Sequence, residues 1–174
     1  MGARDLIAEP SSRYLALQPP VEVSDDLARV MAQLGTPHAL PHVTLVAPPE
    51  VPSAGAWLDA VDTVARATIP FPLRLGAVAS FGERVRYLSV EGEGVNALRV
   101  ALEVALALTP REQPFVAHLT LGVTRRGALP PIDLAAIPES VHRPFLVTAL
   151  GLFVRPALVA PYARTRTFAF VGEP

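Results

Sequence analysis

Residues 41–46 read PHVTLV, and much later in the chain residues 117–122 read AHLTLG. Both stretches follow the pattern apolar, His, apolar, Thr, Leu, although the whole sequence contains only four histidines. Two copies of His-x-Thr-Leu would arise by chance in about one shuffled sequence in three thousand, whereas a single copy would carry no information. We therefore take the repeat as the starting point for both the fold and the function.

Each copy of the repeat is typical of a β-strand with one polar face and one apolar face. Successive side chains of a strand point to opposite faces, so His42 and Thr44 share a face while their aliphatic neighbours point into a core. The same alternation places His118 and Thr120 together. If the two strands lie side by side about a pseudo-twofold axis, two imidazoles and two hydroxyls converge on one pocket.

Two imidazoles and two hydroxyls suit the cleavage of a phosphodiester. A neutral imidazole can take a proton from the nucleophile, and an imidazolium can give one to the leaving oxygen. The hydroxyls can donate hydrogen bonds to the non-bridging phosphate oxygens as negative charge builds there. The alternative interpretation is a polar strand face turned to water, which would suffice for a single copy of the motif.

A zinc site built from the histidines is disfavoured. Pro37 and Pro41 prevent His38 and His42 from pairing on a helix, and no carboxylate stands at a usual ligand spacing. We expect His38 and His142 to be surface or structural residues, and we expect neither a metal nor another cofactor.

Composition excludes several function classes. The 174 residues are 51% hydrophobic with a net charge of −1, which favours one globular domain and disfavours a broad electrostatic grip on long nucleic acid. The sequence has no cysteine and no lysine, which excludes disulfides, cysteine nucleophiles and Schiff-base chemistry. Its apolar stretches are far shorter than the roughly 20 residues of a membrane span. We expect a soluble, cytoplasmic protein with no membrane contact.

The order of the predicted elements is that of an α+β protein. Residues 1–12 are expected to form a flexible leader and residues 13–174 a single domain. Helices are predicted after the N-caps Ser24 and Ser53 and over 95–108. Strands are predicted over 13–17, 42–46, 71–78, 85–91, 115–121, 144–154 and 162–170.

With these motifs, the sequence resembles the 2H phosphoesterase superfamily, whose mark is two His-x-Thr/Ser-hydrophobic motifs on paired strands. Within it, the chain is most similar to the RNA 2′,3′-cyclic phosphodiesterases, historically called 2′-5′ RNA ligases. The resemblance implies two pseudo-symmetric lobes of antiparallel sheet backed by helices, with the active-site cleft between them. It also implies catalytic roles for His42, Thr44, His118 and Thr120.

The activity implied by the resemblance is hydrolysis of a 2′,3′-cyclic phosphate to a 2′-phosphate. The expected partners are RNA 3′ ends or small cyclic nucleotides, with no obligate protein partner. His118 is assigned as the base that activates water and His42 as the acid. Reversible 2′-5′ RNA ligation would use the same residues, and a non-catalytic module that binds nucleotides or RNA ends is the alternative from another class.

Candidate substrate-binding residues lie near the motifs. Many relatives carry an arginine at the fifth position after the second histidine, where this chain has Val123. Arg125 and Arg126 follow, and Arg126 would face the cleft if the strand continued in register. Phe81 and Tyr14 are candidates for stacking against a base, with packing in a core or turn as the other interpretation.

Substitution of the repeated histidines tests this hypothesis. His42→Ala and His118→Ala should each lower the rate of cyclic-phosphate hydrolysis at least about a hundredfold, because a general acid or base typically contributes that much. The double variant should be scarcely slower than either single variant, since the pair acts as a unit. His142→Ala is the control and should retain nearly the wild-type rate. A folded His118→Ala protein with full activity would overturn the hypothesis.

Overall fold

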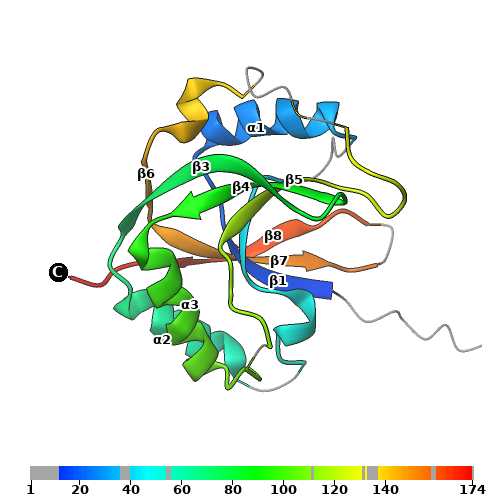
Figure 1. Ribbon diagram of the computed structural model, residues 1–174. Helices are drawn as coiled ribbons and strands as arrows, with labels where there is room; N and C mark the ends of the chain where they lie inside the picture. The colour runs from blue at the N-terminus through cyan, green and yellow to red at the C-terminus, as the bar shows by residue number, and fades with distance from the viewer. Residues whose placement is uncertain are drawn as a thin grey trace, which may run out of the picture.

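The computed structural model describes residues 12–35, 40–53, 56–110, 112–130, 132, 137–157 and 160–173. Its strands form one antiparallel sheet in the order β6-β3-β4-β5-β2-β1-β7-β8. The sheet is curled, with α1 above it and α2 and α3 below it in the view of Figure 1, and buried side chains of all three helices belong to one hydrophobic core. The α+β class predicted from the sequence is confirmed.

The elements have the following bounds. The strands are β1 (Ser12–Leu17), β2 (Val43–Val46), β3 (Phe71–Phe81), β4 (Val85–Glu91), β5 (His118–Val123), β6 (Phe145–Val147), β7 (Ala149–Arg155) and β8 (Ala163–Ala169). The helices are α1 (Val21–Gln33), α2 (Trp57–Ala67) and α3 (Glu93–Ala105), with short 3₁₀ turns η1 (Pro48–Glu50) and η3 (Glu139–His142).

The sheet divides into two halves that meet where β5 pairs with β2. We call β6-β3-β4-β5 the His118 half and β2-β1-β7-β8 the His42 half. The helix that follows β1, α1, packs against β5 and η3, whereas the helix that follows β4, α3, packs against β2, β3 and α2. Each half therefore contributes a helix that packs on the other, which gives the two pseudo-symmetric lobes that were expected.

The motif strands have the alternating burial that their sequence predicts. Val43 and Leu45 on β2 are buried, as are Leu119 and Leu121 on β5. The histidine and threonine side chains of both motifs remain only partly buried. The aliphatic faces thus contribute to the hydrophobic core, and the polar faces are left to the opposite side of the sheet.

Both predicted helix caps are wrong. Helix α1 begins at Val21 directly after Pro20, and Ser24 lies inside its first turn with its hydroxyl donating to the carbonyl of Pro19 at 3.1 Å. The fixed φ angle of proline suits a helix start, so the helix begins about one turn earlier than a serine cap would allow. Helix α2 begins at Trp57 after Ala56, beyond Ser53.

Other boundaries also differ from the prediction: β5 begins at His118 instead of residue 115, β3 extends to Phe81, and α3 spans Glu93–Ala105. The single strand expected over 144–154 is interrupted at Thr148, because β6 pairs with β3 while β7 pairs with β1. Ser12, placed in the leader by the sequence, belongs to β1 and pairs with Arg155. Residues 1–11 lie outside the described residues. In the described part of the chain, every helix is too short or too polar to cross a membrane.

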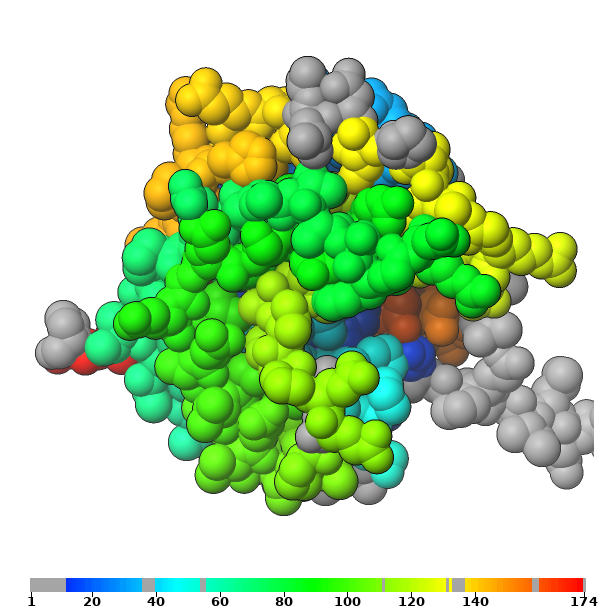
Figure 2. All heavy atoms as spheres, in the orientation of Figure 1, coloured from blue at the N-terminus to red at the C-terminus, as the bar shows by residue number. Residues whose placement is uncertain are grey.

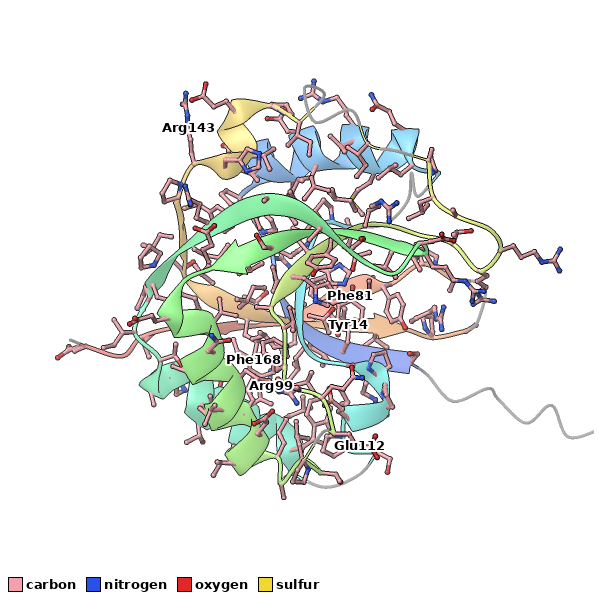
Figure 3. All side chains as sticks on the ribbon, viewed as in Figure 1. Tyr14, Phe81, Arg99, Glu112, Arg143 and Phe168 are labelled. Carbon is pink, nitrogen blue, oxygen red and sulfur yellow. The ribbon has the colours of Figure 1, made fainter. Side chains whose placement is uncertain are left out.

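A buried arginine connects α3 to the first motif strand. Arg99 is 2% exposed and donates to the carbonyl of Leu45 at the end of β2. Its guanidinium also pairs with Glu50 at 2.8 Å and with Glu103 at 2.7 Å. It lies 5.3 Å from the ring centre of Phe115, in the segment that leads into β5. Figure 3 shows Arg99 beside α3.

Replacing Arg99 by methionine should destabilise the protein. The variant leaves the Glu50 carboxylate and the Leu45 carbonyl without their buried cation, a loss that typically costs about 3–5 kcal/mol of unfolding free energy. Urea unfolding measures this change. The matched control is Arg74→Met, which removes a half-exposed ion pair with Glu91 and should cost about 1 kcal/mol or less. Equal losses in the two variants would contradict the proposed importance of the buried arginine.

Candidate active site

The two motif strands lie next to each other in the sheet. Strands β2 and β5 pair antiparallel, with Val43 opposite Leu119. Continuing this register by one residue each way puts His42 opposite Thr120 and Thr44 opposite His118. Residues directly opposite in an antiparallel pair project to the same face. The structure therefore brings all four polar side chains of the motifs together on one face, each imidazole across from a hydroxyl.

Both histidines are oriented by the same hydrogen bond. Nδ1 of His42 lies 2.6 Å from the carbonyl oxygen of Leu40, and Nδ1 of His118 lies 2.7 Å from the carbonyl oxygen of Val116. In each case the acceptor is the residue two positions earlier. A carbonyl oxygen can only accept, so each Nδ1 carries a proton and each Nε2 is left free to exchange one with a substrate.

His42 packs into a cluster of aromatic rings. Its imidazole stacks on Tyr14 with 4.8 Å between ring centres, and Phe153 lies 6.1 Å away. Tyr14 in turn stacks on Phe153 at 4.9 Å and meets the edge of Tyr162 at 4.8 Å. Tyr14 is 5% exposed, so little of its ring remains to stack on a base. The contacts instead indicate that Tyr14 holds the imidazole of His42 in place.

His118 has an aromatic wall of its own, but a more open one. The rings of Phe81 and Tyr87 meet the imidazole edge to face, with 5.1 and 5.2 Å between ring centres, and these two rings stack on each other with 4.3 Å between their centres. Phe81 is 42% exposed, so part of this ring remains available to a ligand. Of the two residues predicted to stack on a base, Phe81 is therefore the more exposed ring, and the role itself stays a prediction.

Tyr87 and Phe153 contact the candidate histidines but were not predicted from the sequence. For Tyr87 a signal existed, since Arg13-Tyr14-Leu15 on β1 recurs as Arg86-Tyr87-Leu88 on β4. The two tyrosines occupy the strands next to β2 and β5, one in each half. For Phe153 no comparable repeat exists, because its role depends on the pairing of β7 with β1.

Burial shifts the pKa values of two of these side chains, His42 and Tyr14. The pKa of His42 is lowered from its usual 6.5, chiefly because burial disfavours the charged imidazolium. The hydrogen bond to Leu40 acts in the opposite direction, and positive charge on His118 lowers the pKa further. Burial and the neighbouring Tyr162 raise the pKa of Tyr14, which therefore stays a neutral phenol.

The arginines that follow the second motif do not continue its strand. Strand β5 ends at Val123, and the next residues turn, with Thr124 donating to the carbonyl of Arg126 at 2.7 Å and Gly127 at a φ of 69°. The condition for Arg126 to face the cleft is thus not met. Arg125 and Arg126 are both exposed, on a loop whose ends bond to the β3–β4 turn.

The remaining histidines stand apart from the motifs. Nδ1 of His142 donates to the carbonyl of Leu75 at 2.8 Å, which is a structural contact between η3 and β3. His38 lies outside the described residues. Among the residues that the structure does describe, no group of three or more His, Cys, Asp or Glu side chains could hold a metal ion.

The molecular surface is hollowed on this face. Figure 2 shows a recess below the β3–β4 hairpin and beside the segment that leads into β5. Atoms of β1, in blue, and of the β7–β8 region, in orange, form its floor. The recess lies where the two halves meet, as expected for a cleft between lobes.

Comparison with known proteins gives a family and a fold. A family model described as the 2′-5′ RNA ligase superfamily matches residues 19–157. The structure of TT0787 from Thermus thermophilus is similar at a TM-score of 0.71 and 23% identity, covering 94% of this chain and 100% of that one. E. coli LigT in complex with 3′-AMP gives 0.67 and 19%, with 93% and 99% covered. A crystal structure described as a phosphoesterase gives 0.63 and 20%, with 93% and 99% covered. A search of curated proteins found no match.

The titration of His42 is a direct test of the site geometry. Its Cε1–H resonance in NMR spectra recorded across a pH series should show a pKa below 6.5, because the buried ring resists protonation. His118→Ala should raise this pKa, since it removes a neighbouring positive charge, without bringing it above the usual value. His142→Ala, the control, should leave it unchanged. Protonation of His42 above pH 6.5 would contradict the described environment.

The same shift has a consequence for stability. Between the lowered pKa of folded His42 and the value of 6.5 in the unfolded chain, the unfolded state binds more protons. The contribution of this residue to stability should therefore fall as the pH decreases through that window. In urea unfolding across that window, the free energy of unfolding of the wild type should therefore fall more steeply with decreasing pH than that of His42→Asn.

Proposed function

Because this chain belongs to the 2′-5′ RNA ligase superfamily, we propose that it hydrolyses 2′,3′-cyclic phosphates at RNA ends or on nucleotides to 2′-phosphates. Membership of the superfamily supports a phosphoesterase or ligase in general. The narrower proposal is supported mainly by one observation, the pair of histidines whose Nδ1 atoms are both held by backbone carbonyls.

Two imidazoles with free Nε2 atoms can divide the proton transfers of hydrolysis between them. One Nε2 takes a proton from water as the water oxygen bonds to phosphorus. The other Nε2–H gives its proton to the 3′ oxygen as the bond between phosphorus and that oxygen breaks. The phosphate then remains on the 2′ oxygen, and one proton has entered and one has left the pair.

The lowered pKa of His42 favours this residue as the base. A group that is neutral at physiological pH is ready to accept a proton, and burial makes the free imidazole the stable form of His42. His118 then serves as the acid. This reverses the assignment made from the sequence, which contains no information on how deeply each imidazole is buried.

The threonine hydroxyls and Phe81 complete the proposed site. Thr44 and Thr120 lie across the strand pair from the histidines, where they can donate hydrogen bonds to the non-bridging phosphate oxygens. The exposed part of Phe81 can stack on the base of the reacting nucleotide. Arg125 and Arg126 remain candidates for phosphate contacts only at the outer rim, because both are exposed beyond the end of β5.

Nucleotide binding by similar structures is consistent with this proposal. E. coli LigT has been crystallised with 3′-AMP, with phosphate and with ATP. Ligation of 2′-5′ linkages would use the same residues in the reverse direction, so hydrolysis and ligation are measured together on one RNA substrate.

Turnover in the presence of a chelator tests the proposed function. Purified protein incubated with a nucleoside 2′,3′-cyclic phosphate and excess EDTA should release the nucleoside 2′-phosphate, because the proton transfers need only imidazoles. Chromatography against 2′- and 3′-phosphate standards identifies the product. Loss of activity under EDTA with recovery on adding zinc would refute the metal-free mechanism. Binding without any turnover between pH 5 and 9 would instead favour the non-catalytic module.

A further inference from the structure

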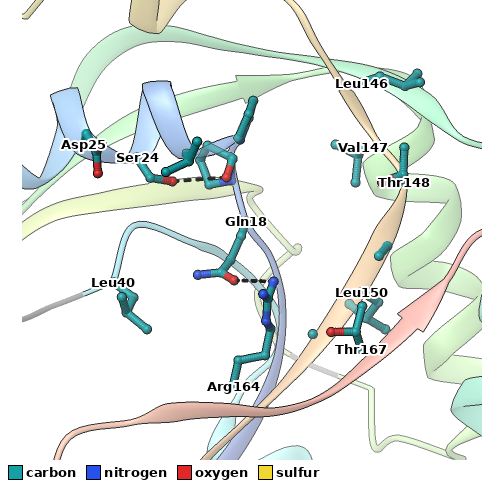
Figure 4. A pocket seen from close by; sticks show the side chains of 15 residues that line it. Gln18, Ser24, Asp25, Leu40, Leu146, Val147, Thr148, Leu150, Arg164 and Thr167 are labelled. Atoms are coloured by element: carbon teal, nitrogen blue, oxygen red, sulfur yellow. Dashed lines mark hydrogen bonds between the residues drawn. The ribbon is translucent and has the colours of Figure 1, made fainter.

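A cavity lies at the end of the His42 half, between β1, β7, β8 and the first turn of α1. It has a volume of about 540 Å³, within the range of about 300–1,000 Å³ typical of small-molecule sites. Gln18 at the end of β1, the first turn of α1, Leu40, and residues of β6, β7 and β8 line it. In Figure 4 Gln18 and Arg164 reach toward each other, with Leu40 on one side and the segment from Leu146 to Leu150, at the junction of β6 and β7, on the other.

Arg164, the charged residue of the cavity, lies on the same face of the sheet as the histidines, as the surroundings of Gly151 indicate. A Cβ atom on Gly151 would lie 2.8 Å from a ring atom of Phe153 and 3.2 Å from Cδ of Arg164. The side chains of Phe153 and Arg164 thus share one face of β7 and β8. Phe153 packs on Tyr14 and lies against His42, so Arg164 belongs to the active-site face.

Leu40 connects the cavity to His42. Leu40 lines the cavity, and its carbonyl accepts the hydrogen bond from Nδ1 of His42. The Nε2 atom that faces the substrate is on the opposite side of the same ring. A substrate chain that leaves the reacting phosphate along this face of the sheet would pass His42 on its way to the cavity.

The polar groups of the cavity match a nucleotide unit. Arg164 is the only cationic side chain among its described lining residues, and Gln18 holds the guanidinium at 2.9 Å without neutralising it. A guanidinium held by an amide keeps other N–H groups for a phosphate. Asp25 and the hydroxyls of Ser24, Thr148 and Thr167 can bond to base or ribose groups.

The corresponding place in the His118 half is filled. There Glu91, which occupies the position of Gln18 in the Arg-Tyr-Leu repeat, forms an ion pair with Arg74 at 2.5 Å. A Cβ on Gly76 would lie 2.5 Å from both the Glu91 carboxylate and the Ser89 hydroxyl, so these side chains cover that strand. The Glu91 carboxylate on this strand repels phosphate. In the cavity of the His42 half the one carboxylate among the described lining residues, Asp25, lies at the α1 end, away from Arg164 (Figure 4), so among the described residues this half is the better path for an RNA chain.

We propose that this cavity binds the ribonucleotide that precedes the terminal cyclic phosphate, with Arg164 at the phosphodiester between the two residues. The inference rests on the proposed function, and it identifies the preferred substrate as an RNA end of at least two nucleotides. With the 2′ and 3′ oxygens in the cyclic phosphate and the terminal base on Phe81, the chain continues through its 5′ oxygen past His42.

The test compares two substrates in matched variants. The wild type should have a kcat/KM about tenfold higher for a dinucleotide ending in a 2′,3′-cyclic phosphate than for the corresponding cyclic mononucleotide. Arg164→Gln should remove most of this preference by lowering the dinucleotide value, without changing the mononucleotide value. Thr167→Phe, which fills the cavity from an exposed position, should do the same. The preference of the wild type should also weaken with added salt.

Arg166→Gln is the control, on the same strand. The guanidinium of Arg166 lies 4.7 Å from the ring centre of Phe168, and Arg166 does not line the cavity. This variant should keep the full preference for the dinucleotide. Equal losses in Arg164→Gln and Arg166→Gln, equal loss on both substrates in Arg164→Gln, or no preference in the wild type would each overturn the inference.

Failure of the proposed function would be recognised separately. If the wild type converts neither substrate, the hydrolase proposal fails, and the cavity is tested by calorimetry with a mononucleotide and a dinucleotide that both end in a 2′-phosphate. Tighter binding of the dinucleotide, reduced by Arg164→Gln and unchanged by Arg166→Gln, would support the cavity as a nucleotide site. Equal affinities would overturn it.

Discussion

The guanidinium of Arg99 is almost completely removed from water, and it can remain charged there only because two carboxylates and a backbone carbonyl surround it. These partners come from different segments of the chain. The Leu45 carbonyl follows Thr44 on the first motif strand, and Glu50 also accepts from the backbone N–H of Ala47 in the turn after it. Phe115, against which the guanidinium packs, precedes the carbonyl that orients His118. A single charge on α3 thus constrains the chain next to both motifs, and the relative position of the two imidazoles depends on it.

The site combines a symmetric backbone with asymmetric surroundings. Both histidines are fixed by a carbonyl two residues earlier, and both contact a tyrosine from the adjacent strand. The rings around His42 are buried, whereas Phe81 beside His118 is partly exposed. Burial thereby lowers the pKa of His42, as the proposed role of this residue as a base requires. The surroundings of the two halves differ too, since Glu91 covers the strand in one half, whereas a cavity opens beside Gln18 in the other.

Local patterns predicted the parts of the fold that depend on local physics. Alternation in the two motifs identified β2, β5 and their buried faces. Helix starts were misplaced because two prolines determine the beginning of α1 more strongly than a nearby serine does. Arg126 was expected to lie on the same strand face as His118 and Thr120, and this expectation was wrong because β5 ends at Val123. Phe153 and the cavity beside His42 depend on β7 pairing with β1, a contact between distant segments that no local pattern encodes.

Thr148 is the only residue between β6, at one edge of the sheet, and β7, beside β1 in the other half. Its carbonyl accepts from the backbone N–H of Phe170 at 2.8 Å, so this short crossing is itself anchored. Besides the packing of α1 and α3 across the two halves, the halves are joined by the ladder at β2–β5 and by this one-residue link. Because β6 is held by its pairing with β3 and β7 by its pairing with β1, this link fixes one half directly to the other. We therefore expect the spacing of the two imidazoles to be set before a ligand binds.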